Sequence, residues 1–91
     1  DFNKRAFIFS ELFEEAYGEI IPLAQEKEIA LVKENSLDSE EVVGDRERLK
    51  KVLKNLLSNS IKFTPKGGEV SAEIKSREGI IELEIRDNGL G

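Results

Sequence analysis

Residues 45–64, in the middle of the chain, constrain the fold more than any other stretch. Its apolar residues recur at the spacing of one helical face: Leu49, Val52, Leu53, Leu56, Leu57 and Ile61. Asp45 precedes this pattern as an N-cap, and Thr64 ends it because a residue that precedes proline avoids helical angles. The pattern predicts a helix over about 45–63 that packs one side against a core.

A second, polar stripe runs along the same predicted helix. At about 100° per residue, Asn55, Asn59 and Lys62 fall well round from the apolar face, with Val52 and Phe63 between the two stripes. Asparagine is a poor residue for a helix interior, so the repeated carboxamide needs a reason. One interpretation is that both amides are solvated or bonded to nearby backbone. The other is that an oxygen of Asn59 coordinates a hard cation such as Mg²⁺ while Lys62 contacts a phosphate.

The remaining segments predict one more helix and several strands. The helix is capped by Ser10, runs to about residue 27 and bends at Pro22. A short edge strand is expected at 7–9, and further strands at 29–34 and 41–44. A hairpin follows, with strands at 69–75 and 81–86 joined by a tight turn at 77–79. The predicted fold class is α+β: a two-layer sandwich with both helices on one face of a mixed, mainly antiparallel sheet.

The last strand ends with a carboxylate on an apolar face. Continued alternation places Asp87 on the side of Ile81, Leu83 and Ile85, which the helices should cover. A carboxylate there is costly unless it is hydrogen-bonded or lies at the mouth of a pocket. The glycine-rich residues 88–91 are able to bring backbone close to a ligand, although an ordinary hairpin turn is the alternative. The segment is expected to belong to a longer domain, truncated after residue 91.

Composition excludes several classes of function. The net charge of −5 argues against binding to nucleic acid or to an anionic membrane. A polyphosphate partner would therefore need a metal ion and a few placed lysines. The 91 residues contain neither cysteine nor histidine, which excludes disulfide, thiolate and imidazole chemistry within them. No apolar run approaches the roughly 20 residues that span a bilayer.

Taken together, the run Asn-Leu-Leu-Ser-Asn-Ser-Ile-Lys-Phe-Thr-Pro at 55–65, a hairpin, and Asp-Asn-Gly-Leu-Gly at 87–91 resemble the ATP-binding domain of sensor histidine kinases. This is the Bergerat ATP-binding fold, shared more distantly with gyrase B, Hsp90 and MutL. The helix at about 45–63 resembles the N box and residues 87–91 the G1 box, so 1–91 would form part of one such domain. Asn55 stands where the gyrase-like branch has glutamate, which favours the kinase branch.

The resemblance implies a role for each matching residue. Asn59 would bind Mg²⁺, Asn55 would help position phosphate or metal-bound water, and Lys62 would contact phosphate. These three residues would form the catalytic set. The nucleotide-binding set would add four further positions to Asn59 and Lys62, namely Phe63, Asp87, Gly89 and Gly91.

Within that second set the implied contacts differ. Phe63 would line the nucleotide pocket, and Asp87 would accept a hydrogen bond from the adenine amino group. Guanine would be rejected, because its carbonyl would leave both groups unpaired. Gly89 and Gly91 would let the backbone approach the nucleotide closely.

The implied activity is transfer of the γ-phosphate of Mg·ATP to a histidine on a separate dimerisation domain, for relay to a response regulator. The intact protein would be a homodimer, and this domain would be cytoplasmic whether the protein is membrane-anchored or soluble. The phosphoacceptor histidine, the later glycine boxes and the lid are absent, so the 91 residues alone should be inactive. Two alternatives stay open: a protein-serine kinase of the anti-sigma type, and a non-catalytic module that docks a partner.

Overall fold

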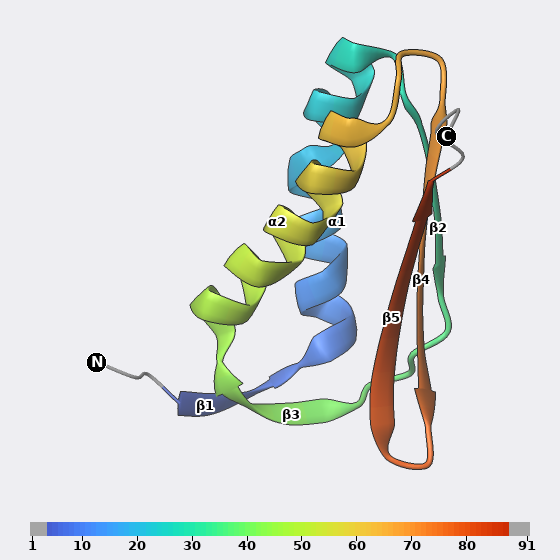
Figure 1. The fold of residues 1–91 in the computed structure, drawn as a ribbon. Coiled ribbons are helices and arrows are strands. Elements are labelled where there is room, and N and C mark those ends of the chain that lie inside the picture. Colours follow the sequence, from blue (N-terminus) through green and yellow to red (C-terminus); the bar gives the residue numbers. More distant parts are fainter. Residues whose placement is uncertain (1–3, 88–91) are drawn as a thin grey trace.

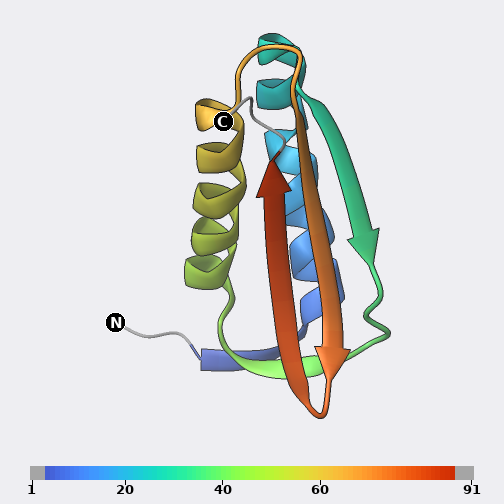
Figure 2. The ribbon, with the colours of Figure 1, turned by 45° about the vertical axis from the view of Figure 1, so that its right-hand side comes forward.

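The fold is described by a computed structural model that places residues 4–87. Its elements follow in the order β1 (Lys4–Ile8), α1 (Phe9–Lys27), β2 (Ala30–Asn35), β3 (Glu41–Asp45), α2 (Arg46–Phe63), β4 (Glu69–Arg77) and β5 (Ile80–Asp87). The two helices lie side by side and cover one face of the sheet that contains β2, β4 and β5 (Figures 1 and 2). The predicted two-layer α+β architecture is confirmed.

Five strands form two sheets within the described residues. In the larger sheet the order is β2-β4-β5, with β2 parallel to β4 and β4 antiparallel to β5. A two-residue turn joins β4 to β5, and its residues Glu78 and Gly79 both have positive φ, 52° and 79°. This backbone suits the twist of a hairpin. The short strands β1 and β3 pair with each other and form a separate antiparallel sheet.

The start of α1 differs from the prediction that Ser10 caps it. The helix begins at Phe9, directly after β1, and the N-cap residue Ile8 makes no side-chain capping bond. The backbone N–H of Phe9 instead donates to the carbonyl of Glu40 at 3.0 Å. The hydroxyl of Ser10 accepts a hydrogen bond from Nδ2 of Asn35 at 3.1 Å. The cap prediction is wrong because β1 leads into the helix one residue before Ser10.

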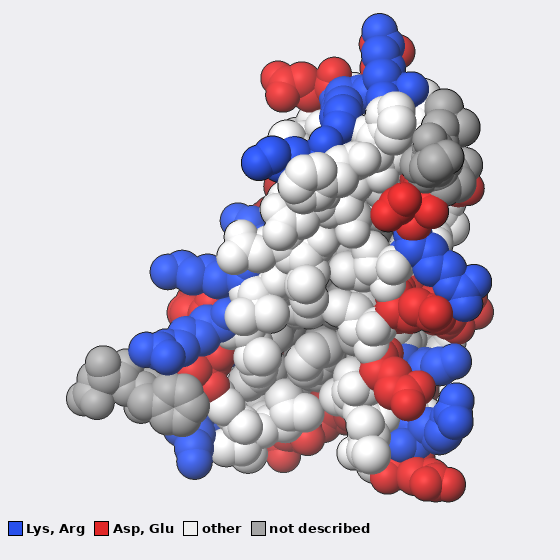
Figure 3. Space-filling view, in the orientation of Figure 1, with Lys and Arg blue, Asp and Glu red and all other residues white. Residues whose placement is uncertain are grey.

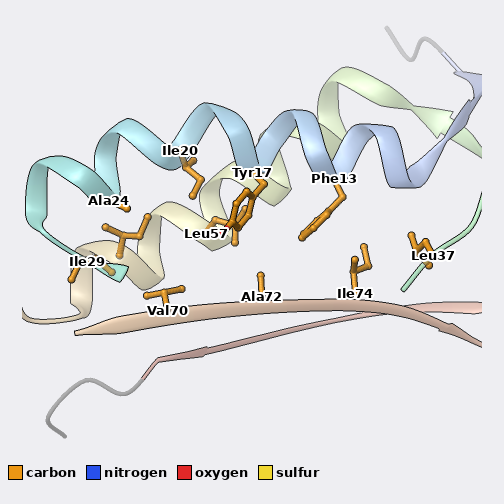
Figure 4. Close-up of a cluster of buried hydrophobic side chains, with 11 residues drawn as sticks. Phe13, Tyr17, Ile20, Ala24, Ile29, Leu37, Leu57, Val70, Ala72 and Ile74 are labelled. Atoms are coloured by element: carbon orange, nitrogen blue, oxygen red, sulfur yellow. The ribbon is translucent and has the colours of Figure 1, made fainter. Parts of the chain in front are cut away.

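The main core lies between the helix layer and β4. Figure 4 shows side chains from α1 pointing toward β4, with Leu57 of α2 beside them. Its buried members are Phe13, Tyr17, Ile20, Ala24, Ile29, Leu37, Leu57, Ile61, Val70, Ala72 and Ile74. A second cluster, formed by Phe7, Leu12, Ala16 and Leu53, fills the space where β1 meets the helices. The helix layer is therefore anchored mainly over β4, the central strand of the larger sheet.

Both predicted ends of α2 are confirmed. Asp45 is the N-cap residue, and its carboxylate accepts a hydrogen bond from the backbone N–H of Arg48 at 3.2 Å. The helix ends at Phe63, and Thr64 takes extended angles of φ −95° and ψ 128° before the proline. Neither of the helices in the described range is long and apolar enough to cross a membrane.

The predicted apolar face of α2 is only partly buried. One side of it is buried, at Leu53, Leu57 and Ile61. Leu49 is half-buried. Leu56 is 45% exposed, so the prediction that it packs into the core is wrong. Val52, which the pattern places between the two stripes, is 51% exposed. The six apolar positions spread over about half the helix circumference, and the sheet and α1 cover only one side of that arc.

Candidate functional site

The polar stripe of α2 faces outward, as the sequence pattern predicts. Asn55, Asn59 and Lys62 are all exposed. They lie on the side of the helix roughly opposite Leu57, which is 0% exposed. In the range 4–87, no side-chain hydrogen bond of Asn55 or Asn59 to another protein group is found, so both amides face water. Their carbonyl oxygens therefore suit a ligand that arrives from solution.

A hollow of about 530 Å³ lies between the C-terminal halves of the two helices. It is lined by Leu23, Glu26, Lys27, Ser58, Asn59, Ile61 and Lys62. Asn59 and Lys62 thus border one space, with an amide and an ammonium about one turn apart. Asn55 and Phe63, which the resemblance assigns to the same site, do not line it. The volume is within the range of about 300–1,000 Å³ that is usual for small-molecule sites.

Phe63 lies beside the ammonium of Lys62 at the end of the helix. The Nζ atom of Lys62 is 5.6 Å from the centroid of the Phe63 ring, within the range of a cation–π contact. The ring is 75% exposed. A large aromatic side chain this exposed presents a flat apolar surface next to the hollow, and its role in lining a nucleotide pocket stays a prediction.

Several contacts hold the last turn of α2. The ammonium of Lys27, at the end of α1, donates to the carbonyls of Ile61 at 3.0 Å and Lys62 at 2.6 Å. Thr64, which is fully buried, donates from its hydroxyl to the carbonyl of Ser60 at 2.7 Å. Its backbone N–H also donates to the carbonyl of Ile61 at 3.2 Å. Carbonyls that a helix end leaves without intrahelical partners are thereby satisfied.

Sequence reasoning missed Lys27. A lysine in the last turn of a helix indicates only a favourable interaction with that helix's own carboxyl end. Its partners here belong to another helix, 34 and 35 residues further along the chain. No local pattern in the sequence connects the two positions.

Ion pairs join the helices along the rest of their contact. Glu15 accepts from Arg46 at 3.1 Å and from Lys50 at 2.8 Å, and Glu19 accepts from Lys54 at 2.8 Å. The hydrogen bonds from Arg46 and Lys50 lower the pKa of Glu15 to about 2. The hydrogen bonds to Glu15 and Glu19 raise the pKa of Lys50 to about 12. These pairs hold α2 against α1 along the part of their contact that precedes the hollow, and none of their residues lines it.

Asp87 lies on the predicted face of β5, but it is not buried. It pairs with Val70, as Ile85 does with Ala72, and directly paired residues share a face, so its carboxylate is on the helix side. The structure leaves Asp87 exposed, and the expectation of a covered carboxylate is wrong. The helices cover β4, whereas β5 is the edge strand of the larger sheet and its inward residues are only half-buried.

The end of β5 nevertheless lies at the same end of the molecule as the hollow. The arrowhead of β5 points to the same end of the molecule as the last turns of α2 (Figures 1 and 2). Asp87, at this strand end, is thus placed at the same end as Asn59 and Lys62. Gly89 and Gly91 lie outside the described residues.

An uncharged surface strip runs between α2 and β5, with charged side chains on both sides of it (Figure 3). Val52 and Leu56 are each two residues from Lys54, and therefore about 200° round the helix from it. Because Lys54 pairs with α1, these exposed apolar side chains point away from α1, toward the open side of α2. The site thus has an amide and ammonium on one flank and an apolar surface on the other.

A cation in this site would need ligands from outside the protein. In the part of the chain that the structure describes, no group of three or more acidic, histidine or cysteine side chains could hold a metal ion. Mg²⁺ commonly takes one or two protein oxygens together with water and substrate phosphates. The exposed oxygen of Asn59 beside the ammonium of Lys62 fits that kind of shared site.

Comparison with known proteins identifies the family of the chain. A family model described as "Histidine kinase-, DNA gyrase B-, and HSP90-like ATPase" matches residues 44–91, more than half of the chain. The autoinducer 2 sensor kinase/phosphatase LuxQ of Vibrio parahaemolyticus is 35% identical over 95 residues. That match covers 98% of this chain and 11% of LuxQ, so the chain spans a small part of this relative.

Solved structures share the fold. The catalytic domain of histidine kinase ThkA has a TM-score of 0.85 at 24% identity, over 96% of this chain and 59% of that one. ThkA in complex with the response regulator protein TrrA has a TM-score of 0.84 at 23% identity, over 94% of this chain and 26% of that one. At these identities the likeness concerns the fold alone.

Proposed function

Because the chain belongs to the family of histidine kinase-, DNA gyrase B- and HSP90-like ATPases, we propose that it is part of the ATP-binding domain of a two-component sensor histidine kinase. The observation that carries the proposal is the pairing of Asn59 with Lys62 at one hollow, on a helix that lies within the family match. A scaffold that only docks a partner has no need of an exposed amide and ammonium beside one space. ATP is the ligand that the family implies.

In this proposal Asn59 holds Mg²⁺ through its amide oxygen, and Lys62 binds a phosphate oxygen of ATP. Bound Mg²⁺ neutralises charge on the phosphates and completes its shell with water. Asn55, one turn earlier on the same face, orients phosphate or metal-bound water. The part of these residues in phosphoryl transfer is positioning and charge neutralisation, and none of them forms a covalent intermediate.

In the same proposal, the adenine base lies on the side of α2 that faces β5. Phe63 presents its exposed ring beside Lys62, and the uncharged strip between α2 and β5 offers an apolar surface. The carboxylate of Asp87 accepts a hydrogen bond from the adenine amino group. Gly89 and Gly91 are assigned close backbone contacts with the nucleotide on the resemblance of 87–91 to the G1 box.

The proposed acceptor is a histidine on a separate dimerisation domain of the same protein, in a homodimer. A bond forms between an imidazole nitrogen and the γ-phosphorus, the bond from that phosphorus to ADP breaks, and the imidazole proton passes to solvent. The phosphoryl group then passes to a response regulator. The family description, which names histidine kinases, and the ThkA complex with the response regulator protein TrrA support histidine rather than serine as the acceptor.

Replacement of Asn59 by alanine in the intact protein tests the proposal. We expect loss of Mg²⁺-dependent autophosphorylation, with the helical circular dichroism signal retained, because Asn59 is exposed. Gln25→Ala is the matched control, since it removes an exposed carboxamide from α1. Autophosphorylation of Asn59→Ala at the wild-type rate would exclude the metal role.

A further inference from the structure

The two helices are held in a constant register. The pairs Glu15–Lys50 and Glu19–Lys54 each join residues 35 positions apart, and the bond from Lys27 to the carbonyl of Lys62 has the same separation. Residues four apart lie on one helical face, so these contacts form a ladder along two parallel helices. Leu23 and Ser58, which have the same separation of 35 positions, both line the hollow.

The last step of the ladder has different chemistry from the first two. It joins an ammonium to two backbone carbonyls instead of a carboxylate to an ammonium. The carboxyl end of a helix carries partial negative charge on such carbonyls, and a cation there stabilises the final turn. The backbone that carries Lys27 is itself tied down, because the carbonyl of Glu28 accepts from the N–H of Gly67 at 3.1 Å.

The hydrogen bonds from Lys27 also disfavour one competing conformation of Lys62. A lysine in the last turn of a helix is able to fold back and donate to that helix's own terminal carbonyls. Lys62 occupies such a position in α2. Because Lys27 already donates to the carbonyls of Ile61 and Lys62, the ammonium of Lys62 has less to gain by folding back. It remains available to a ligand in the hollow.

We propose that Lys27 is a positioning residue of the nucleotide site: it holds the last turn of α2, which directs Lys62 toward the phosphates. The inference rests on the proposed function. Lys27 acts here through α2 and needs no contact with the nucleotide.

The test measures the dissociation constant of Mg·ATP for the full-length protein and its variants. Lys27→Met should raise this constant about two- to fivefold, the range that corresponds to a cation at a helix carboxyl end. Lys27→Arg should restore most of the affinity, since it keeps the charge and the donors. The matched control is Lys54→Met, which removes the ion pair at the second step of the ladder, away from the hollow, and should leave binding unchanged.

A double-mutant cycle separates positioning from a general loosening of the helices. If Lys27 acts through Lys62, then Lys27→Met should cost little further affinity in a Lys62→Met background. An equal loss in both backgrounds, or an equal loss in Lys54→Met, would overturn the proposal. If Lys27→Met loses helical signal, Lys27→Gln replaces it, because glutamine keeps a donor without the charge.

The outcomes also distinguish this inference from the proposed function. Wild-type affinity in Lys27→Met, together with weakened binding in Lys62→Met, would overturn the role of Lys27 and leave the nucleotide site intact. Wild-type affinity in both Lys62→Met and Asn59→Ala would overturn the nucleotide site itself, and the role of Lys27 with it.

Discussion

Leu57 and Leu56 are neighbouring leucines on α2 that differ in burial, so they test which face of the helix packs into the core. Leu57 is 0% exposed within the main core, whereas Leu56 is 45% exposed. Leu57→Ala should lower the free energy of unfolding by about 2–5 kcal/mol, because it removes buried methyl groups and leaves a cavity. Full burial of a leucine side chain is worth about 1.5–3 kcal/mol, so the half-exposed Leu56 should lose only about 1 kcal/mol on the same change.

Urea unfolding of the 91-residue chain, followed by circular dichroism, measures both values. With a denaturant slope of about 1–3 kcal/mol/M, the Leu57→Ala midpoint should fall by about 1 M or more, and the Leu56→Ala midpoint by clearly less. The change in helix propensity is the same in both variants, so it cancels in their difference. Equal losses would show that Leu56 is buried and that the assigned orientation of α2 is wrong.

Two further predictions concern ionisable side chains. The pKa of Glu15 is lowered from 4.5 to about 2, so its contribution to stability is present above pH 4.5 and is lost as the pH falls toward 2. Urea melts over this pH range should therefore show that the free energy of unfolding falls more steeply with decreasing pH for wild type than for Glu15→Gln. The same pH dependence in both proteins would contradict the role of the Arg46 and Lys50 hydrogen bonds. Asp87→Asn in the intact ATP-binding domain should weaken ATP binding by about 1.5 kcal/mol, roughly tenfold, the lower end for a charged hydrogen bond because the carboxylate is exposed. Competition between ATP and GTP measures this, and an unchanged affinity ratio would remove Asp87 from the site.

The boundaries of α2 could be predicted because they depend on local chemistry. A carboxylate at Asp45 satisfies a backbone N–H three residues ahead, and Pro65 excludes helical angles at Thr64. The outward direction of Asn55 and Asn59 likewise follows from helical geometry alone. The start of α1 could not be predicted in this way, since it depends on a bond from Phe9 to Glu40, which is distant in sequence.

How deeply a side chain is buried was harder to predict than the face of the helix or strand on which it lies. Alternation correctly placed Asp87 on the helix side of β5, but only the lateral position of the helices decides whether that side is covered. The exposure of Val52 and Leu56 has the same cause. The angular spread of an apolar helix face does not show how much of that face the neighbouring elements cover. The contact of Lys27 was the hardest to predict from the sequence. Its partners are backbone carbonyls, which every residue carries, so the sequence does not mark them.

The ladder between the helices restricts insertions and deletions within them more strictly than it restricts substitutions. Inserting or deleting one residue within either helix between two steps would turn the later steps by about 100° and separate their partners. The segment between the helices, residues 28–45, carries the chain from one to the other and takes part in no step of the ladder. Changes of length among relatives of this domain should therefore be excluded from the helices between Glu15 and Lys27 and between Lys50 and Lys62.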